Sequence, residues 1–173
     1  MIIESVRAEF LRYKGLAEKA IAQTKDAELS AAGPGDGSSI ATICRHIAGN
    51  LKSRFTDFLT TDGEKPWRHR DSEFETRSVT RARVLEHWDE GWRVLLDALG
   101  ALSDAQLNAR VTIRQQPLSV HEALHRSVTH VAYHVGQIVY LAKSFRGDDW
   151  DSLSIPPGQS ERYNQSPDKE RAR

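Results

Sequence analysis

Four segments of the chain carry apolar residues at steps of three and four, the spacing of one buried face of an amphipathic helix. They lie near residues 3–21, 38–58, 80–102 and 120–145. Capping signals support two of the starts: Ser38 or Ser39 can cap the second segment, and Ser119-Val120-His121-Glu122 is a capping box at the fourth. Four such segments predict an all-α fold, a four-helix bundle.

The segments between the predicted helices differ in character. Residues 31–38 contain three glycines and a proline, which predict a turn. Residues 60–79 are polar and weakly periodic, which predicts a long connection between the second and third helices. A connection of this length is usually functional or joins distant elements. Between the third and fourth helices, Ser103–Gln106 forms a capping box that predicts a helical turn. The alternating, β-branched run Val111–Arg114 predicts a short strand or an extended connection, and Pro117 stops any helix.

The chain divides at about residue 150 in composition. We expect residues 1–150 to form one helical bundle and residues 151–173 to form a polar C-terminal tail. Three prolines and many charged residues leave the tail too polar to bury much surface, so we expect it to be loosely held.

Charge and cysteine content narrow the function classes. The 24 basic and 24 acidic residues cancel, so no overall basic field exists to hold nucleic acid or an anionic membrane. The single cysteine, Cys44, excludes an intrachain disulfide and fits a reducing compartment. The N-terminus lacks a signal-peptide core, and no apolar run reaches the roughly 18 residues of a spanning helix. We expect a cytoplasmic protein without nucleic-acid or membrane partners.

Candidate chemistry centres on His130 and His134 in the fourth predicted helix. A spacing of four residues places both on one side of the helix, on one shoulder of its apolar stripe. Two histidines can hold one metal ion but cannot complete a site, which usually takes three or four protein ligands. His121 and His125 have the same spacing but lie on the opposite shoulder, so the two pairs cannot share an ion.

His46 in the second predicted helix is the candidate third ligand. It lies at the border of that helix's apolar stripe, where one ring nitrogen can face the interior and the other can meet a partner. Three neutral imidazoles suit a borderline divalent ion such as zinc or nickel and leave positions open for water or substrate. Such an ion can lower the pKa of bound water or hold a thiol as thiolate.

Plainer interpretations compete with this site. Histidine pairs at helical spacing often serve in capping or packing, and a single border histidine such as His46 is usually structural. Arg54 lies within an apolar stripe and needs a partner or a polar cavity, and Asn50 and Arg54 can simply tie down the loop that follows. Cys44 is expected in the core. The cluster Arg68-His69-Arg70 is expected to be an exposed group of loop charges.

Two motifs carry a resemblance to a known family. The first is Ile43-Cys44-Arg45-His46-Ile47-Ala48-Gly49-Asn50-Leu51, and the second is His130-Val131-Ala132-Tyr133-His134-Val135-Gly136-Gln137-Ile138. Over residues 1 to about 150 the chain resembles the DinB/YfiT-like superfamily, and the stretch Asp57-Phe58-Leu59-Thr60-Thr61-Asp62-Gly63-Glu64-Lys65 resembles one subfamily of uncharacterised bacterial proteins. The resemblance implies a four-helix bundle, a homodimer and a divalent metal held by His46, His130 and His134.

The resemblance also bears on activity. Some superfamily members are bacillithiol S-transferases or a mycothiol-dependent isomerase. It therefore implies a metal-dependent enzyme acting on a small molecule, either a transferase with a low-molecular-weight thiol as co-substrate or a hydrolase. The alternatives are a non-enzymatic, stress-associated dimer that binds metal or ligand, and a bundle without metal. Asn50, Arg54, Tyr133 and Gln137 are candidates to support the ligands or line the pocket; no catalytic residue and no organic cofactor site is assigned.

Overall fold

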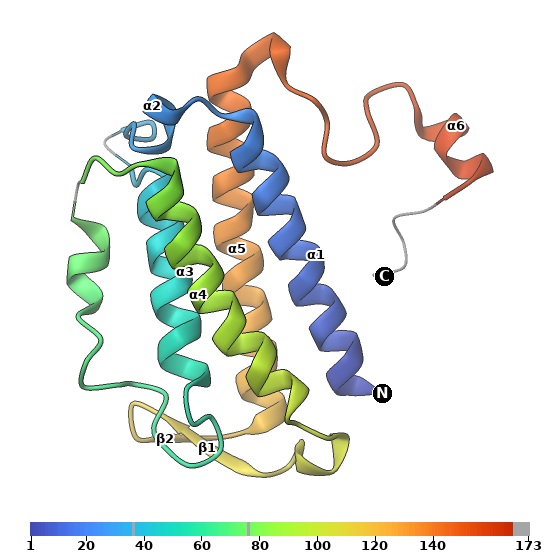
Figure 1. Cartoon of the computed structure of the whole chain (residues 1–173). Helices are drawn as coiled ribbons and strands as arrows, with labels where there is room; N and C mark the ends of the chain where they lie inside the picture. The colour runs from blue at the N-terminus through green and yellow to red at the C-terminus, as the bar shows by residue number, and fades with distance from the viewer. Residues whose placement is uncertain (36, 76, 168–173) are drawn as a thin grey trace.

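The computed structural model describes residues 1–35, 37–75 and 77–167, and four long helices dominate it (Figure 1). They are α1 (Ile2–Gln23), α3 (Ile40–Phe55), α4 (Arg81–Gly100) and α5 (Val120–Arg146). Helix α3 packs against α4 and α5, and α1 packs against α5 and touches α4. The predicted all-α class is confirmed in that the chain is mainly helical with one small hairpin.

Short helical segments lie at the ends of the long helices and in the connections. Helix α2 (Asp26–Leu29) follows α1, and the 3-10 helix η1 (Arg70–Phe74) packs against α3 from within the long connection. The 3-10 helix η2 (Asp104–Gln106) forms at the predicted capping box, and η3 (Gly147–Asp149) follows α5. The predicted turn at residues 31–38 contains a bridge between Gly33 and Gly37, while Asp36 lies outside the described residues.

Helices α3 and α5 begin where serine hydroxyls satisfy free backbone N–H groups. Ser39 Oγ accepts from the Thr42 N–H at 3.1 Å, and Ser119 Oγ accepts from the Glu122 N–H at 3.2 Å. Both helices therefore begin at serines that the sequence indicated as caps. Helix α3 is shorter than its apolar stripe, because the chain turns at Asp57, whose φ is 48°.

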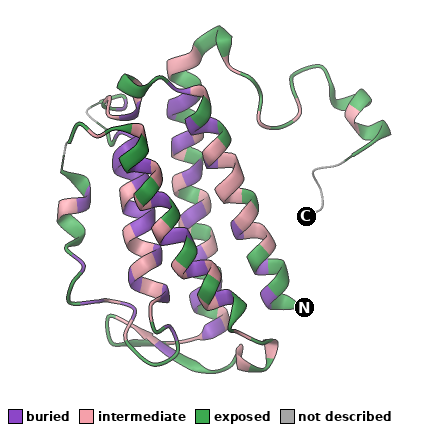
Figure 2. Cartoon of the chain, in the orientation of Figure 1, coloured by how far each residue is buried: buried purple, intermediate pink, exposed green. Residues whose placement is uncertain are grey.

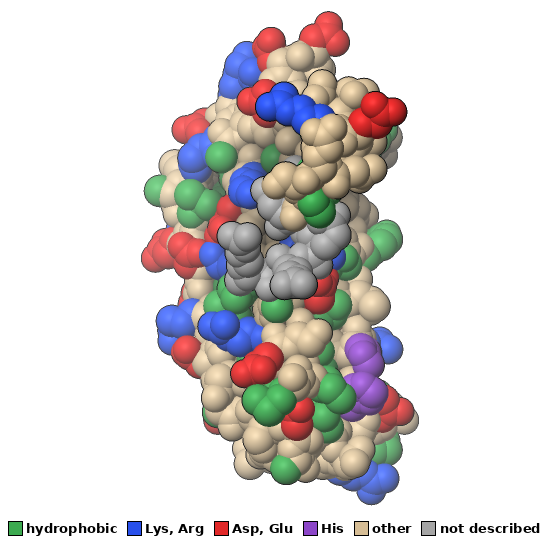
Figure 3. All heavy atoms as spheres, turned by 90° about the vertical axis from the view of Figure 1, so that its right-hand side faces the viewer, with side chains coloured by type: hydrophobic (Ala, Val, Ile, Leu, Met, Phe, Trp, Pro, Cys, Tyr) green, Lys and Arg blue, Asp and Glu red, His purple; other side chains and the backbone are tan. Residues whose placement is uncertain are grey.

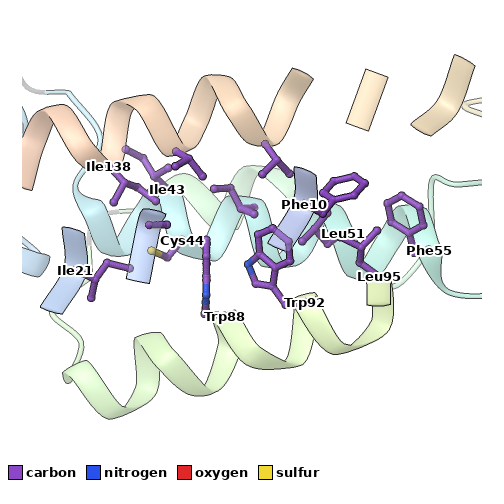
Figure 4. Packing of buried hydrophobic residues seen from close by; sticks show 14 of the residues in the cluster. Phe10, Ile21, Ile43, Cys44, Leu51, Phe55, Trp88, Trp92, Leu95 and Ile138 are labelled. Carbon is purple, nitrogen blue, oxygen red and sulfur yellow. The ribbon is translucent and has the colours of Figure 1, made fainter. Parts of the chain in front are cut away.

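The core lies between the four long helices, whose inward faces are buried (Figure 2). Figure 4 shows Trp88 and Trp92 of α4 reaching toward Phe10 of α1 and the apolar side chains of α3. The Phe10 and Trp92 rings meet edge to face, with centroids 6.2 Å apart. Full burial of one such side chain contributes about 2–3 kcal/mol. Cys44 is also buried, as predicted, and burial raises the pKa of its thiol to about 12.

Gly91 lets α3 and α4 approach closely. A Cβ atom at Gly91 would lie 2.6 Å from Ala48 Cα and 2.7 Å from the Ala48 carbonyl oxygen. These are backbone atoms, so they cannot rotate aside. The close crossing holds the middle of α3 against α4 at Ala48, while His46, two residues earlier, contacts His130 of α5.

A two-stranded hairpin, β1 (Arg110–Ile113) and β2 (Gln116–Ser119), covers one end of the helices (Figure 1). Strand β1 agrees with the predicted strand. Strand β2 was not predicted, because Pro117 by itself indicates only that a helix stops. Both strands of a two-stranded hairpin are edge strands, so a proline is tolerated there. The turn residues Arg114 and Gln115 have φ values of 53° and 63°, unusual for residues with a side chain.

Asp62 in the long connection stabilises this turn. Its carboxylate accepts hydrogen bonds from the backbone N–H groups of Glu64, Arg114 and Gln115 at 2.7–2.8 Å. These bonds, the one from Glu64 first, lower the pKa of Asp62 to about 2. The Gly63 N–H also donates to the Thr112 carbonyl at 2.8 Å. The first half of the long connection is therefore bound to the hairpin, and its second half packs against α3 through η1.

The segment after α5 lies along the outside of the helices. Trp150 and Leu153 pack against the core, and beyond them α6 (Ser160–Gln165), which was not predicted, buries none of its residues. Residues 168–173 of the predicted tail lie outside the described residues. On the face in Figure 3, acidic and basic side chains are interspersed. Among the described helices, none combines the length and the apolar character needed to cross a membrane.

Candidate metal centre

Three histidines from two helices meet between α3 and α5. His46 lies in the middle of α3 and is 4% exposed, and His130 and His134 lie one turn apart on α5. His46 Nε2 lies 3.2 Å from His130 Nε2, and each histidine offers a ring nitrogen within 4.8 Å of the other two. Two nitrogens bound to one ion at about 2.0–2.1 Å lie about 3.0–3.4 Å apart, so the observed pair fits shared coordination.

Hydrogen bonds at Nδ1 fix the ring nitrogen that two of these histidines present. His46 Nδ1 lies 2.8 Å from Glu73 Oε2, and His134 Nδ1 lies 2.7 Å from Gln137 Oε1. Both partners are oxygens that accept, so Nδ1 carries the proton in the neutral rings and Nε2 keeps its lone pair. This second contact from each ligand is typical of metal-binding histidines.

Glu73 is the functional residue that the sequence did not indicate. It is 6% exposed, and Arg68 donates to its carboxylate through Nε at 2.8 Å and Nη2 at 3.0 Å. Burial alone would raise the pKa of Glu73, but the hydrogen bonds from His46 and Arg68 outweigh it and lower the pKa. The expectation that Arg68 is an exposed loop charge is wrong, because the arginine is buried against Glu73.

Gly49 leaves the space that Glu73 occupies. A Cβ atom at Gly49 would lie 2.3 Å from Glu73 Oε1, so any side chain there would displace the carboxylate. The length and polarity of the connection were the only signals in the sequence that a functional residue lies within it.

His130 is held as a neutral imidazole. Burial and the neighbouring His134 and His46 lower its pKa to about 3. Burial also lowers the pKa of His134. A neutral ring is the form that binds a metal ion, so little proton competition is expected at neutral pH.

Two cavities flank the three histidines. The first, of about 220 Å³, is lined by His46 and His130 and also by Asn50 and Arg54. Arg54 donates to the Gly63 carbonyl and, at 3.3 Å, to Glu64, so it does tie down the connection while facing the cavity. Its pKa is lowered, chiefly by burial.

The second cavity, of about 580 Å³, is lined by His46, His134, Tyr133 and Gln137. Gln137 Nε2 lies 3.4 Å from the hydroxyl of Tyr133, which is 65% exposed. Each of the four supporting residues expected from the sequence therefore lies beside one of the two cavities, and Gln137 also contacts a histidine.

The competing pair, His121 and His125, lines neither of these two cavities. The His121 and His125 rings lie tilted by 57° to each other, with centroids 4.2 Å apart. Within residues 1–35, 37–75 and 77–167, the cluster of His46, His130 and His134 is the one group of three or more potential ligands brought close enough to share an ion.

The fold and the three histidines together place this chain among mainly helical proteins that carry a candidate metal-binding site. The chain belongs to the family DUF1572, described as "Protein of unknown function", whose model matches residues 1–159. A comparison with curated proteins found no match.

Proposed function

We propose that this protein is a metal-dependent enzyme of the DinB/YfiT-like superfamily, that its four long helices form the bundle of that superfamily, and that His46, His130 and His134 hold a divalent ion. The observation that carries the proposal is the arrangement of the imidazoles: the 3.2 Å separation of two Nε2 atoms, with Nδ1 contacts that leave Nε2 of His46 and His134 free to coordinate. An all-imidazole donor set favours zinc or nickel over magnesium or calcium, which prefer oxygen ligands.

The chain's own residues have distinct roles in this proposal. Glu73 orients His46 and increases the basicity of its Nε2, and Arg68 holds Glu73 in place. Gln137 orients His134 in the same way. Three protein ligands leave room for one further group, the arrangement of catalytic rather than structural zinc sites. When bound, the ion would lower the pKa of a coordinated thiol or water.

Thiol transfer is the better supported of the two reaction types. Neither cavity beside the histidines is lined by Asp or Glu within the described part of the chain, so no carboxylate faces the substrate as a general base. A free thiol has a pKa of about 8.5, whereas that of water is about 15.7. The thiol therefore needs far less assistance to become a nucleophile. We propose a low-molecular-weight thiol as co-substrate and a small electrophile as substrate.

Elemental analysis of the untagged protein tests the metal site. We expect about one equivalent of zinc or nickel in the wild type and a large loss in His46→Ala and His130→Ala. His69→Ala is the matched control, because this histidine is exposed and lies in the connection. Wild-type protein that takes up no divalent ion, or equal uptake by all three variants, would contradict the proposal.

Activity is tested separately with a chromogenic aryl halide and L-cysteine, in which the sulfur–carbon bond forms as halide leaves. We expect turnover that requires both metal and thiol and is lost in His130→Ala. Metal binding without turnover of this or other electrophiles would favour the alternative of a non-enzymatic metal- or ligand-binding protein.

A further inference from the structure

The smaller cavity beside the histidines is rich in guanidinium groups. No Asp or Glu is found among its lining residues in the described ranges. The arginines that line it come from α3, the long connection, the hairpin turn and α5, so they converge only in the folded chain. They are Arg54, Arg68, Arg70, Arg114 and Arg126.

The carboxylates behind this cavity do not balance its positive charge. Glu64 pairs with both Arg54 and Arg114, Glu73 pairs with Arg68, and Asp71 lies 3.7 Å from Arg70. Three carboxylates therefore face five guanidinium groups, which leaves two positive charges. A cavity with this surplus attracts an anion.

Several donors in the cavity are not used by the protein. Arg126 forms no ion pair with any described residue, and the Asn50 side chain has no hydrogen-bond partner within the same ranges. Ser127 is the most buried of these donors, because it is only 7% exposed. It lines the cavity, and its Oγ has no hydrogen-bond partner among the described residues. Buried polar atoms are nearly always hydrogen-bonded in folded proteins, so the Ser127 hydroxyl is free to bond a group that enters the cavity.

The remaining walls strengthen this attraction. Phe55, Phe58 and Ile113 also line the cavity, and apolar walls of this kind strengthen charge interactions by lowering the local dielectric constant. His46 and His130 line it as well, so an anionic group bound here lies beside the candidate metal centre. The volume of about 220 Å³ is below the roughly 300–1,000 Å³ of pockets for drug-sized ligands and suits one small acidic group.

We propose that this cavity binds the acidic group, a carboxylate or a phosphate, of the substrate, with Arg126 as charged partner and Ser127 Oγ and the Asn50 amide as neutral donors. This inference rests on the proposed function, because the acidic group is the substrate's and would lie next to the proposed metal centre. It adds a substrate class: a small electrophile that carries an acid. Larger apolar parts of that molecule would face the second cavity, which His46 also lines.

Titration of metal-depleted protein with inorganic phosphate and with acetate, at constant ionic strength and followed by NMR amide shifts, tests the proposal without requiring metal or turnover. We expect saturable shifts at residues 50, 126 and 127 with at least one of the two anions. Affinity should fall at least about tenfold in Arg126→Ala and in Ser127→Ala, because charge-assisted contacts contribute about 1.5–3 kcal/mol. Arg93→Ala is the control, an exposed arginine on α4 away from the cavity.

The outcomes separate this inference from the metal site. Binding of acetate but not phosphate assigns a carboxylate, and the reverse assigns a phosphate. Anion binding that is equal in Arg126→Ala, Ser127→Ala and wild type, or absent for both anions, overturns the inference even if metal is bound. Arginine-dependent anion binding in a protein that takes up no metal overturns the proposed function and leaves the anion cavity standing. The Arg126 side chain forms no ion pair and the Ser127 hydroxyl no hydrogen bond within the described residues, so both variants are expected to fold.

Discussion

Glu73 Oε2 lies 2.8 Å from His46 Nδ1, although 27 residues separate the two in the chain. The carboxylate belongs to η1, in the middle of the long connection, and the histidine to α3. This contact turns a connection without regular periodicity into part of the candidate metal centre.

Glu73→Gln is therefore expected to weaken metal binding. The amide keeps the shape of the side chain but loses the negative charge that increases the basicity of His46, so we expect a loss of about 10- to 100-fold in metal affinity. Competition with a chromophoric chelator measures it. Glu64→Gln is the matched control, since it removes a carboxylate that pairs with Arg54 and Arg114 but does not touch the histidines. Equal affinities in the two variants would show that Glu73 does not support the ligand.

Gly49→Ala should disturb the same contact without changing any charge. The new methyl group would lie 2.3 Å from Glu73 Oε1 and would displace the carboxylate from His46. We expect metal affinity to fall about tenfold and stability to fall by about 1–3 kcal/mol. In Gly15→Ala, where a Cβ meets nothing within 4 Å, we expect unchanged metal affinity and a gain of about 0.5–1 kcal/mol. Chelator competition measures the metal affinity of both variants, and urea unfolding measures their stability.

Gly91→Ala tests the packing of α3 against α4. The added methyl group would overlap the Cα and carbonyl oxygen of Ala48, so the two helices must separate. Overpacking of this kind costs about 1–3 kcal/mol, measurable by urea unfolding. The double variant Gly91→Ala, Ala48→Gly should recover only part of the loss, because the backbone atoms remain in the way. Full recovery would mean that only the methyl groups collide.

Asp62 should make stability depend on pH in the acidic range. Its folded-state pKa of about 2 lies below the usual 3.8, so its contribution is fully present above about pH 4 and is lost as the pH falls toward 2. We expect Asp62→Asn to be less stable than wild type by about 1 kcal/mol near neutral pH, a modest figure because the site is partly exposed. Urea unfolding at several pH values should show the gap closing below pH 4. In Asp71→Asn, with a fully exposed carboxylate, we expect no such convergence.

The helices could be predicted from sequence because their cause is local. Apolar residues at steps of three and four place one face of each helix in the core, and Ser39 and Ser119 satisfy backbone N–H groups within their own first turns. The same periodicity placed His130 and His134 together and placed His46 at the edge of a buried face. Strand β2 and α6 were missed, because Pro117 and the polar tail carry no comparable periodic signal.

What the sequence by itself determined, then, is the set of long helices and the faces on which the three histidines lie, since both depend on periodicity within one segment. The tertiary structure alone decided that Glu73 and its partner Arg68 reach His46, and that arginines from four separate segments line one cavity. Those positions depend on how the connection folds back over α3. That path is determined by contacts between distant residues, such as Asp62 with the hairpin turn and Glu73 with the space above Gly49.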